Sequence, residues 1–174
     1  MSNEFHRGGF ENVTPVRGER TLLRAVEAAD VDLLLAWHAD PEIARYWDWE
    51  TFTRETMLER LARPDVTPYL VLADGAAIGY LQVWCDAEGG GIDMFLEPSS
   101  RGRGLGPDAA SAIARHLVDE RGCVRVTVDP YVWNEQAVRA WRKAGFVEVS
   151  RHDADDEHTD PWVLLEFCPY PSRT

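Results

Sequence analysis

The order of patterns between residues 90 and 129 constrains the fold of this chain more than any other feature. An alternation of apolar and polar residues over GGIDMFLEP (90–98) predicts a half-buried strand. The turn RGRGLG (101–106) leads into a helical pattern over 104–121 with one apolar face. A second alternation over CVRVTVD (123–129) predicts another strand. Because a helix joins them, the two strands are expected to be parallel, with a right-handed crossover.

Weaker patterns on either side predict an α+β domain built around this unit. They are a strand at 20–26, two short helices from Asp30 that break at Pro41, a helix over 53–63, a hairpin over 68–84 that turns at Asp74-Gly75, a helix over 134–146 that ends at Gly145, and strands near 146–150 and 162–167. Residues 1–19 show no periodicity and are predicted to form a loose arm, residues 20–168 the domain, and residues 169–174 a tail.

Composition and charge exclude several classes of protein. The chain has 174 residues, 45% hydrophobic and 28% charged, which is typical of one globular domain. No apolar run reaches the ~18 residues of a membrane span and no signal peptide is visible, so we expect a cytoplasmic protein with no membrane partner. The net charge of −12 disfavours nucleic acid and favours cationic partners. Because their spacing fits no metal or redox site, reduced thiols are predicted at Cys85, Cys123 and Cys168.

The glycine-rich turn is predicted to bind an anion. The first N–H groups of a helix have no partner within the helix, and the helix dipole adds partial positive charge there. Glycines at 102, 104 and 106 let the backbone approach a ligand, and two arginines flank them. Such a cradle suits phosphate, although its spacing is neither that of a P-loop nor that of a dinucleotide-binding motif. For the glycines alone, a flexible turn is the alternative.

Two motifs, in the right order and with a strand between them, resemble the GNAT superfamily of acetyl-CoA-dependent N-acetyltransferases. Residues 101–106 are similar to its R/Q-x-x-G-x-G/A motif. NEQAVRAWRKAGF (134–146) is similar to its second signature, in which an Asn opens a helix that ends in K-x-G-F. The resemblance covers about residues 20–168 and implies the GNAT fold. That fold is a central mixed, mostly antiparallel sheet flanked by helices, with one parallel pair splayed apart to hold acetyl-CoA.

The resemblance also implies which residues bind acetyl-CoA. The backbone of Met94, Phe95 and Leu96 would bond the pantetheine, and one N–H there would polarise the thioester carbonyl. The pyrophosphate would lie against the residues of the glycine turn, namely Arg101, Gly102, Arg103, Gly104, Leu105 and Gly106. Asn134 would reach the coenzyme arm, and capping the last helix is its alternative or additional role.

Two departures from the family pattern bear on the mechanism. Many GNAT enzymes carry a Tyr in the second helix that protonates the departing thiolate, whereas this chain has Trp141, whose indole cannot act as an acid. Either the thiolate leaves unassisted, since its pKa is low, or Tyr131 or a water protonates it. Pro107 removes one phosphate-facing N–H, and Asp108 adds a charge that either offsets the helix dipole or weakens cofactor binding.

Within the superfamily, the chain is most similar to the aminoglycoside 6′-N-acetyltransferases. The similarity lies in GGIDMFL (90–96), VTVDPYVWNEQAVRAW (126–141), ARYWDWE (44–50) and TDPWVLLEF (159–167). It implies that Asp93 is the catalytic base or the anchor of the reacting amine and that Asp129 binds the aminoglycoside. Further contacts with the acceptor are implied for Trp47, Asp48, Trp49 and Asp160.

The chemistry of these residues agrees with a small cationic acceptor. Aminoglycosides are polycations, which need carboxylates for their ammonium groups and flat apolar surface for their sugar faces. Asp93 and Asp129 fall on the polar face of adjacent parallel strands. Ordinary solvent exposure of the aspartates and ordinary packing of Trp47 and Trp49 are the alternatives. The acidic loop RHDADDEHTD (151–160) has the spacing of no familiar metal site, so no metal is expected.

The predicted reaction is direct transfer of an acetyl group to the 6′-amine of an aminoglycoside in a ternary complex. Asp93 would accept the amine proton or orient the amine, and no cysteine is placed to form a covalent intermediate. The alternatives are an N-terminal acetyltransferase of the ribosomal-protein type, a polyamine or siderophore acyltransferase, and an acetyl-CoA sensor without activity. Both a monomer and a homodimer are compatible with the sequence.

Overall fold

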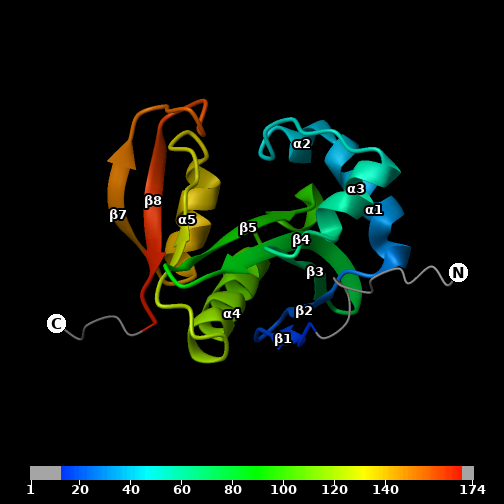
Figure 1. Ribbon diagram of the computed structural model, residues 1–174, viewed down its shortest axis with the longest axis horizontal. Coiled ribbons are helices and arrows are strands. Elements are labelled where there is room, and N and C mark those ends of the chain that lie inside the picture. The colour runs from blue at the N-terminus through cyan, green and yellow to red at the C-terminus, as the bar shows by residue number, and fades with distance from the viewer. Residues whose placement is uncertain (1–12, 170–174) are drawn as a thin grey trace, which may run out of the picture.

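The computed structural model describes residues 13–169, and an eight-stranded sheet lies at its centre (Figure 1). The strands follow the order β1-β2-β3-β4-β5-β6-β8-β7, and in this described sheet only β5 and β6 pair in parallel. The predicted mixed, mostly antiparallel sheet is confirmed. The strands are β1 (Val16–Arg17), β2 (Leu22–Ala25), β3 (Thr67–Ala73), β4 (Ala76–Cys85), β5 (Gly90–Leu96), β6 (Val126–Val128), β7 (Phe146–His152) and β8 (Trp162–Phe167).

The unit β5–α4–β6 has the predicted parallel geometry. α4 (Leu105–Asp119) connects the two strands, which pair at Gly90–Val126 and at Gly91–Thr127. Beyond these two pairs β5 continues to Leu96 without β6 beside it, so the strands separate. The predicted splay is therefore confirmed, and it leaves an opening at the carboxyl ends of both strands.

Helices cover both faces of the sheet (Figure 1). α4 and α5 (Glu135–Lys143) pack into one apolar core with the strands, and the three N-terminal helices pack into a second core on the other side. The N-terminal helices are α1 (Val31–Ala39), α2 (Pro41–Ala44) and α3 (Arg54–Leu61). Pro41 separates the first two of them, as predicted. Across residues 13–169, no helix has both the length and the apolar character needed to cross a membrane.

Both faces of β5 are covered, which the alternation of its residues did not predict. Phe95 is 5% exposed and packs edge-on against Trp37 and Trp47, with ring centroids 5.8 and 5.4 Å apart. Asp93 lies two residues earlier on the same side of the strand and is partly buried. The polar face predicted for this strand is therefore an internal surface covered by the N-terminal helices.

The prediction of a loose N-terminal arm is wrong over its described part. Val16 and Arg17 form β1, which pairs antiparallel with Leu22 and Leu23 of β2. Val16 is buried in the core that α4 covers. Residues 1–12 of the predicted arm and 170–174 of the predicted tail lie outside the described residues, and the domain boundaries at 20 and 168 stay predictions.

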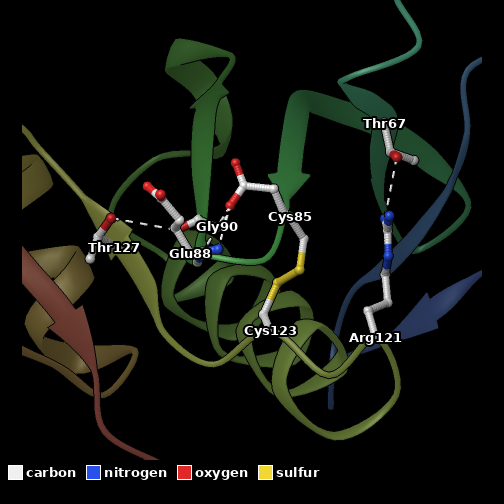
Figure 2. Close-up of a disulfide and its surroundings, with 9 residues drawn as sticks. Thr67, Cys85, Glu88, Gly90, Arg121, Cys123 and Thr127 are labelled. Carbon is white, nitrogen blue, oxygen red and sulfur yellow. Dashed lines mark hydrogen bonds between the residues drawn. A yellow bond between two sulfur atoms is a disulfide. The ribbon is translucent and has the colours of Figure 1, made fainter.

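A disulfide joins Cys85, at the end of β4, to Cys123, in the segment that follows α4 (Figure 2). The two Cα atoms lie 5.9 Å apart, within the usual range for disulfides. The prediction of reduced thiols is therefore wrong for these two residues, because their separation of 38 residues resembles no local motif and only the fold brings them together. Arg121 in the same segment donates to the Thr67 hydroxyl at 3.3 Å, which adds a second link to the sheet.

Candidate functional site

Two adjoining cavities lie where β5 and β6 separate. The first, of about 380 Å³, is called here the glycine cavity, because the glycines of the 101–106 turn line it. The second, of about 340 Å³, is called the acidic cavity, because Asp48, Asp93 and Asp129 line it. The two cavities meet, since both are lined by Tyr46, Met94, Asn134, Ala137 and Trp141.

The turn at the start of α4 leaves a row of backbone donors without partners. Gly102 and Gly104 have φ angles of 74° and 78°, in the left-handed region that favours glycine. A Cβ at Gly102 would meet no atom within 4 Å, and one at Gly104 would meet only the Arg20 side chain, at 3.6 Å. Among residues 13–169, the N–H groups of residues 102–106 find no hydrogen-bond acceptor. Free N–H groups beside open space at a helix N-terminus form an anion-binding cradle.

Residues 94–96 of β5 line the glycine cavity, as does Arg101. The Arg101 guanidinium is already bonded, because its Nε and Nη2 donate to the carbonyls of Leu96 and Glu42, both at 3.0 Å. It also lies over the Tyr46 ring, 5.4 Å from the ring centroid. Arg101 therefore ties the end of β5 to α2, and it also lines the glycine cavity.

The other predicted cofactor residues differ in their placement. Arg103 and Leu105 do not line the glycine cavity. The carbonyl of Arg103 accepts a hydrogen bond from Arg20 at 2.7 Å, and the Leu105 side chain is buried in the core. Asn134 does line the cavity, and its Oδ1 caps α5 by accepting from the N–H of Ala137 at 3.2 Å.

Two cations of α5 line the glycine cavity and were not predicted from the sequence. They are Arg139 and Lys143, which lie four residues apart and therefore on one face of the helix. That spacing, counted from the Asn that opens the helix, is the signal that could have identified them. Their charges favour an anion in the cavity.

Asp108 has a structural role that neither expectation anticipated. Its carboxylate accepts hydrogen bonds from the backbone N–H groups of Glu19 and Arg20, at 2.9 and 3.1 Å, and from the Thr21 hydroxyl at 2.6 Å. Burial alone would raise the pKa of Asp108, but these hydrogen bonds outweigh it and lower the pKa. The carboxylate therefore fastens the turn between β1 and β2 to α4, and it does not line the glycine cavity.

The acidic cavity brings together four of the six residues predicted to contact the acceptor: Asp93, Asp129, Trp47 and Asp48. Trp49 is 63% exposed and Asp160 is also exposed, and neither lines the cavity. Trp47 serves two purposes, because its ring packs edge-on against Phe95 in the core while it also lines the cavity.

Asp93 is held by a chain of hydrogen bonds that begins on β4. Oδ2 of Asp93 accepts from Nε2 of Gln82 at 2.9 Å, and Oε1 of Gln82 accepts from the Tyr80 hydroxyl at 3.0 Å. Burial raises the pKa of Asp93 above its ordinary value, and repulsion from Asp129 adds to the rise. The hydrogen bond from Gln82 and the charge of Arg60 oppose the rise. A carboxylate with a raised pKa is the better proton acceptor near neutral pH.

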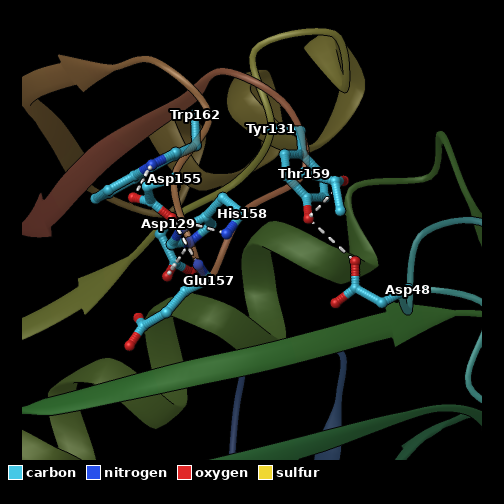
Figure 3. A network of polar contacts seen from close by, with 8 residues as sticks. All are labelled: Asp48, Asp129, Tyr131, Asp155, Glu157, His158, Thr159 and Trp162. Carbon is cyan, nitrogen blue, oxygen red and sulfur yellow. Dashed lines mark hydrogen bonds and ion pairs between the residues drawn. The ribbon is translucent and has the colours of Figure 1, made fainter.

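Two basic side chains, neither of them predicted from the sequence as a site residue, also line the acidic cavity. Arg60 of α3 pairs with Glu50 at 2.9 Å and lies over the ring of Trp47, 5.7 Å from its centroid. His158, in the loop between β7 and β8, contacts Asp129 (Figure 3). Five carboxylates also line the cavity, those of Asp48, Glu50, Asp93, Asp129 and Glu157. The excess of negative charge favours a cationic ligand.

Stacked aromatic rings bridge the two sides of the opening. Tyr46 stacks on Trp133 with ring centroids 5.7 Å apart, and Trp133 stacks on Tyr131 at 5.6 Å. The Tyr131 hydroxyl donates to Oδ1 of Asp48 at 3.1 Å (Figure 3). The hydroxyl considered as a possible acid is therefore bonded to a carboxylate across the opening.

Comparisons with known proteins agree with this geometry. A family model described as an acetyltransferase (GNAT) domain matches residues 27–154. An aminoglycoside N(6′)-acetyltransferase type 1 of Klebsiella pneumoniae is 29% identical over 146 residues, which cover 71% of this chain and 72% of that protein. The uncharacterized N-acetyltransferase YokL of a Bacillus subtilis prophage is 27% identical over 146 residues, covering 78% of this chain and 81% of that protein.

Solved structures show the same architecture. AAC(6′)-Ib in complex with paromomycin and acetyl-CoA has a TM-score of 0.75 and 26% identity, covering 86% of this chain and 93% of that chain. A spermidine N-acetyltransferase from Vibrio cholerae has a TM-score of 0.74 and 16% identity, covering 85% of this chain and 95% of that chain, a likeness of fold alone. The fold class predicted from the sequence is confirmed.

Proposed function

The chain belongs to the GNAT family of acetyltransferases, and we propose that it transfers the acetyl group of acetyl-CoA to the 6′-amine of an aminoglycoside. The observation that carries this proposal is the junction of an anion cradle with a cavity lined by five carboxylates. A phosphorylated donor fits the first and a polycationic acceptor fits the second. The 29% identical relative, named an aminoglycoside N(6′)-acetyltransferase, supports the choice of acceptor.

The residues of the glycine cavity fit acetyl-CoA. The unpartnered N–H groups of residues 102–106 would bind the pyrophosphate, and Arg139 and Lys143 would add positive charge. The backbone of residues 94–96 has no strand beside it on the β6 side, so it is available to the pantetheine arm. When bound, acetyl-CoA supplies the acetyl group as an activated thioester.

The residues of the acidic cavity would bind and deprotonate the acceptor. An amine in water is mostly protonated at neutral pH and must lose a proton before it attacks. Asp93 lies on the strand that borders both cavities, and its raised pKa suits it to accept that proton. Asp129 and Asp48 would hold other ammonium groups, and Trp47 would contact a sugar face.

Trp141 occupies the position in α5 where many GNAT enzymes carry a Tyr that protonates the departing sulfur. Trp141 lines both cavities, but its indole cannot act as an acid. The Tyr131 hydroxyl is bonded to Asp48. We therefore expect the protein to act mainly on the amine, by orienting it and removing its proton. Unassisted departure of the thiolate is compatible with its low pKa.

A polyamine acetyltransferase is the second candidate, because a linear polycation would also satisfy the acidic cavity. A peptide acceptor would need an open groove, whereas the Tyr46–Trp133–Tyr131 stack bridges the opening. A sensor without activity would have no use for a carboxylate with a raised pKa beside the donor cavity. We place the protein in the cytoplasm, where acetyl-CoA is available. The choice between monomer and homodimer stays a prediction.

The test is release of CoA thiol from acetyl-CoA in the presence of kanamycin, spermidine or a peptide with a free N-terminus. We expect kcat/KM to be highest for kanamycin and the kanamycin product to carry one acetyl group. A preference for spermidine or for the peptide would replace the aminoglycoside proposal. Hydrolysis without any acceptor preference would reject acetyl transfer to an amine.

Substitution of Asp93 and of Asp129 is expected to affect different kinetic constants. Asp93→Asn should lower kcat by roughly 10²–10⁴-fold, because a positioned general base contributes about that much. Asp129→Asn should instead raise the acceptor KM roughly tenfold, near the low end of the about 1.5–3 kcal/mol of a charge-assisted contact, because Asp129 is partly exposed. Steady-state kinetics with the best acceptor measure both effects. Asp160→Asn is the control, because Asp160 lies outside the cavity, and equal small effects from all three would contradict these roles.

A further inference from the structure

The acidic cavity contains a basic side chain that the proposed reaction does not use. Nε2 of His158 lies 3.1 Å from Oδ2 of Asp129, and its Nδ1 lies 3.0 Å from Oδ1 of Asp155 (Figure 3). A carboxylate can only accept, and an imidazole donates through both nitrogens only when it is protonated. The two contacts therefore require the cationic form of His158.

The surroundings of His158 favour that cation. Its ring stacks on the Trp162 indole with centroids 4.3 Å apart, and its side chain is 14% exposed. Burial alone would lower the pKa of His158, but the hydrogen bonds to Asp155 and Asp129 outweigh it and raise the pKa. His158 therefore keeps its positive charge up to a higher pH than a free histidine does.

The charged groups around the His158 ring come from two segments, the one after β6 and the loop between β7 and β8. Asp129 comes from the segment after β6, and Asp155 comes from the loop that carries His158. Glu157 of the same loop lines the cavity beside it. Uncharged rings complete the surroundings: Trp162 of β8 stacks on His158, and Tyr131 meets it edge-on at 6.2 Å. His152 of β7 stacks on the same indole, 4.1 Å from its centroid.

The loop holds its shape through contacts that do not involve the imidazole. The Asp155 carboxylate accepts from the N–H groups of Glu157 and His158, at 2.9 and 2.8 Å, and from Nε1 of Trp162 at 3.0 Å. The N–H of Asp155 donates to the His158 carbonyl at 2.9 Å. Loss of the imidazole charge would leave these bonds in place. The main consequence of losing that charge is that the Asp129 carboxylate loses its cationic partner.

We propose that His158 controls how strongly the acceptor site binds an ammonium group, because its imidazolium occupies Asp129 in the free protein and an ammonium group of the acceptor must replace it. This inference rests on the proposed function, in which Asp129 holds an ammonium group. An acceptor with one ammonium gains little at Asp129, because the carboxylate is already neutralised. A polycation can displace His158 and keep its other contacts with Asp48 and Asp93. Protonated His158 therefore weakens the contribution of Asp129 to acceptor binding, and neutral His158 restores it.

Competition between a proton on His158 and the acceptor is reciprocal. Below the pKa of His158 the imidazolium competes for Asp129, and the acceptor binds less tightly. Above that pKa the ring is neutral, Asp129 is open, and the acceptor binds more tightly. By linkage, a bound acceptor must lower the pKa of His158.

Kinetics across pH separate this role from a merely structural one. His158→Gln keeps a hydrogen-bond donor but carries no charge. The acceptor KM of the wild type is divided by the acceptor KM of this variant at each pH, so the ionisation of the acceptor itself cancels. We expect this ratio to be about two- to fivefold near about pH 6 and to approach one near about pH 9. His158→Lys should keep KM high over the whole range. His152→Gln, which changes the other ring on Trp162, should follow the wild type. A ratio that does not change with pH would overturn the proposal.

A second measurement does not depend on turnover. The imidazole of His158 is titrated by NMR in the holoprotein with CoA, with and without saturating kanamycin or spermine. We expect either polycation to lower the pKa of His158, and Asp129→Asn to lower it without any polycation. An unchanged titration in all samples would overturn the role of His158. If no amine is acetylated but the pKa shift occurs, the proposed activity fails and the competition at Asp129 stands.

Discussion

Asp93 and Asp129 are both carboxylates of the acidic cavity, yet their surroundings give them different chemistry. Asp93 is held by Gln82 within the sheet, and burial raises its pKa. Asp129 is 47% exposed at its side chain and faces a cation. A partly buried carboxylate with a raised pKa suits proton transfer, whereas an exposed carboxylate suits the binding of an ammonium group.

The acid limb of the pH–rate profile should follow Asp93. Because the base must be deprotonated, kcat at saturating acceptor should rise as pH rises through the raised pKa of Asp93, whereas His158 affects acceptor binding. Gln82→Leu removes the donor that stabilises the carboxylate, so the pKa should rise and the limb should move to higher pH. Asp129→Asn removes a neighbouring negative charge, so the pKa should fall and the limb should move to lower pH.

Measurement of kcat at saturating acceptor across the acid range tests both shifts. Glu157→Gln is the control, since Glu157 lines the same cavity but is not among the groups that shift the pKa of Asp93. Limbs that move in the same direction in both variants would exclude Asp93 as the titrating base.

Local sequence motifs could identify some of the individual site residues and not others. Asp93, Asp129 and the glycines of the turn stand in short segments that resemble a known family, so the sequence alone indicated them. Gln82 becomes a partner of Asp93 only through the register between β4 and β5. His158 reaches Asp129 only because its loop folds back over the end of β6. Such pairings depend on contacts between distant segments, which periodicity does not encode.

The N-terminus of α4 is the element on which donor binding depends. Gly104→Val places a branched side chain at a φ of 78° beside the unpartnered N–H groups. We expect CoA to bind at least about tenfold more weakly, because the phosphate loses at least one charge-assisted hydrogen bond. Calorimetric titration measures the affinity.

Gly122→Val is the matched control for that substitution. Gly122 also has a positive φ, of 69°, and a Cβ there would meet no atom within 4 Å, but it lies outside both cavities. Both variants should lose similar stability, and only Gly104→Val should lose affinity for CoA. An equal loss of affinity in the two would assign the effect to backbone strain.

The disulfide should stabilise the crossover from α4 to β6. Cys85→Ser is expected to lower the free energy of unfolding by about 2–4 kcal/mol, because a link across 38 residues restricts the unfolded chain. Urea denaturation without reductant measures the difference. With reductant, the wild type and the variant should have the same stability, and a difference that persists would assign the loss to packing around Cys85.

Elements with a clear period were predictable and shorter ones were not. α4 and the hairpin around Asp74-Gly75 carry enough repeats to show their pattern, and Pro41 marks the start of the short α2. β1 has two residues, too few for any period, and it exists because Val16 packs into the core and pairs with β2. β6 is shorter than its alternating segment, because β5 turns away from it after two pairs.

For the whole molecule, charge and topology support one function. The chain carries a net charge of −12, yet Arg139 and Lys143 line the glycine cavity while carboxylates predominate in the acidic cavity. Cationic acceptors are attracted to the molecule as a whole and to the acidic cavity in particular. The phosphorylated donor is held against that field by backbone donors and by these two local cations.

Neomycin and paromomycin provide the most direct test, because they differ in carrying an amine or a hydroxyl at the 6′ position. Each is incubated with the protein and acetyl-CoA, and the products are identified by mass spectrometry and NMR. We expect a single acetyl group on the 6′-amine of neomycin, no acetylation of paromomycin, and inhibition of the neomycin reaction by paromomycin. Two results would contradict transfer to a 6′-amine. One is acetylation of both antibiotics at an amine other than the 6′-amine, and the other is acetylation of neither antibiotic although a different amine compound is acetylated.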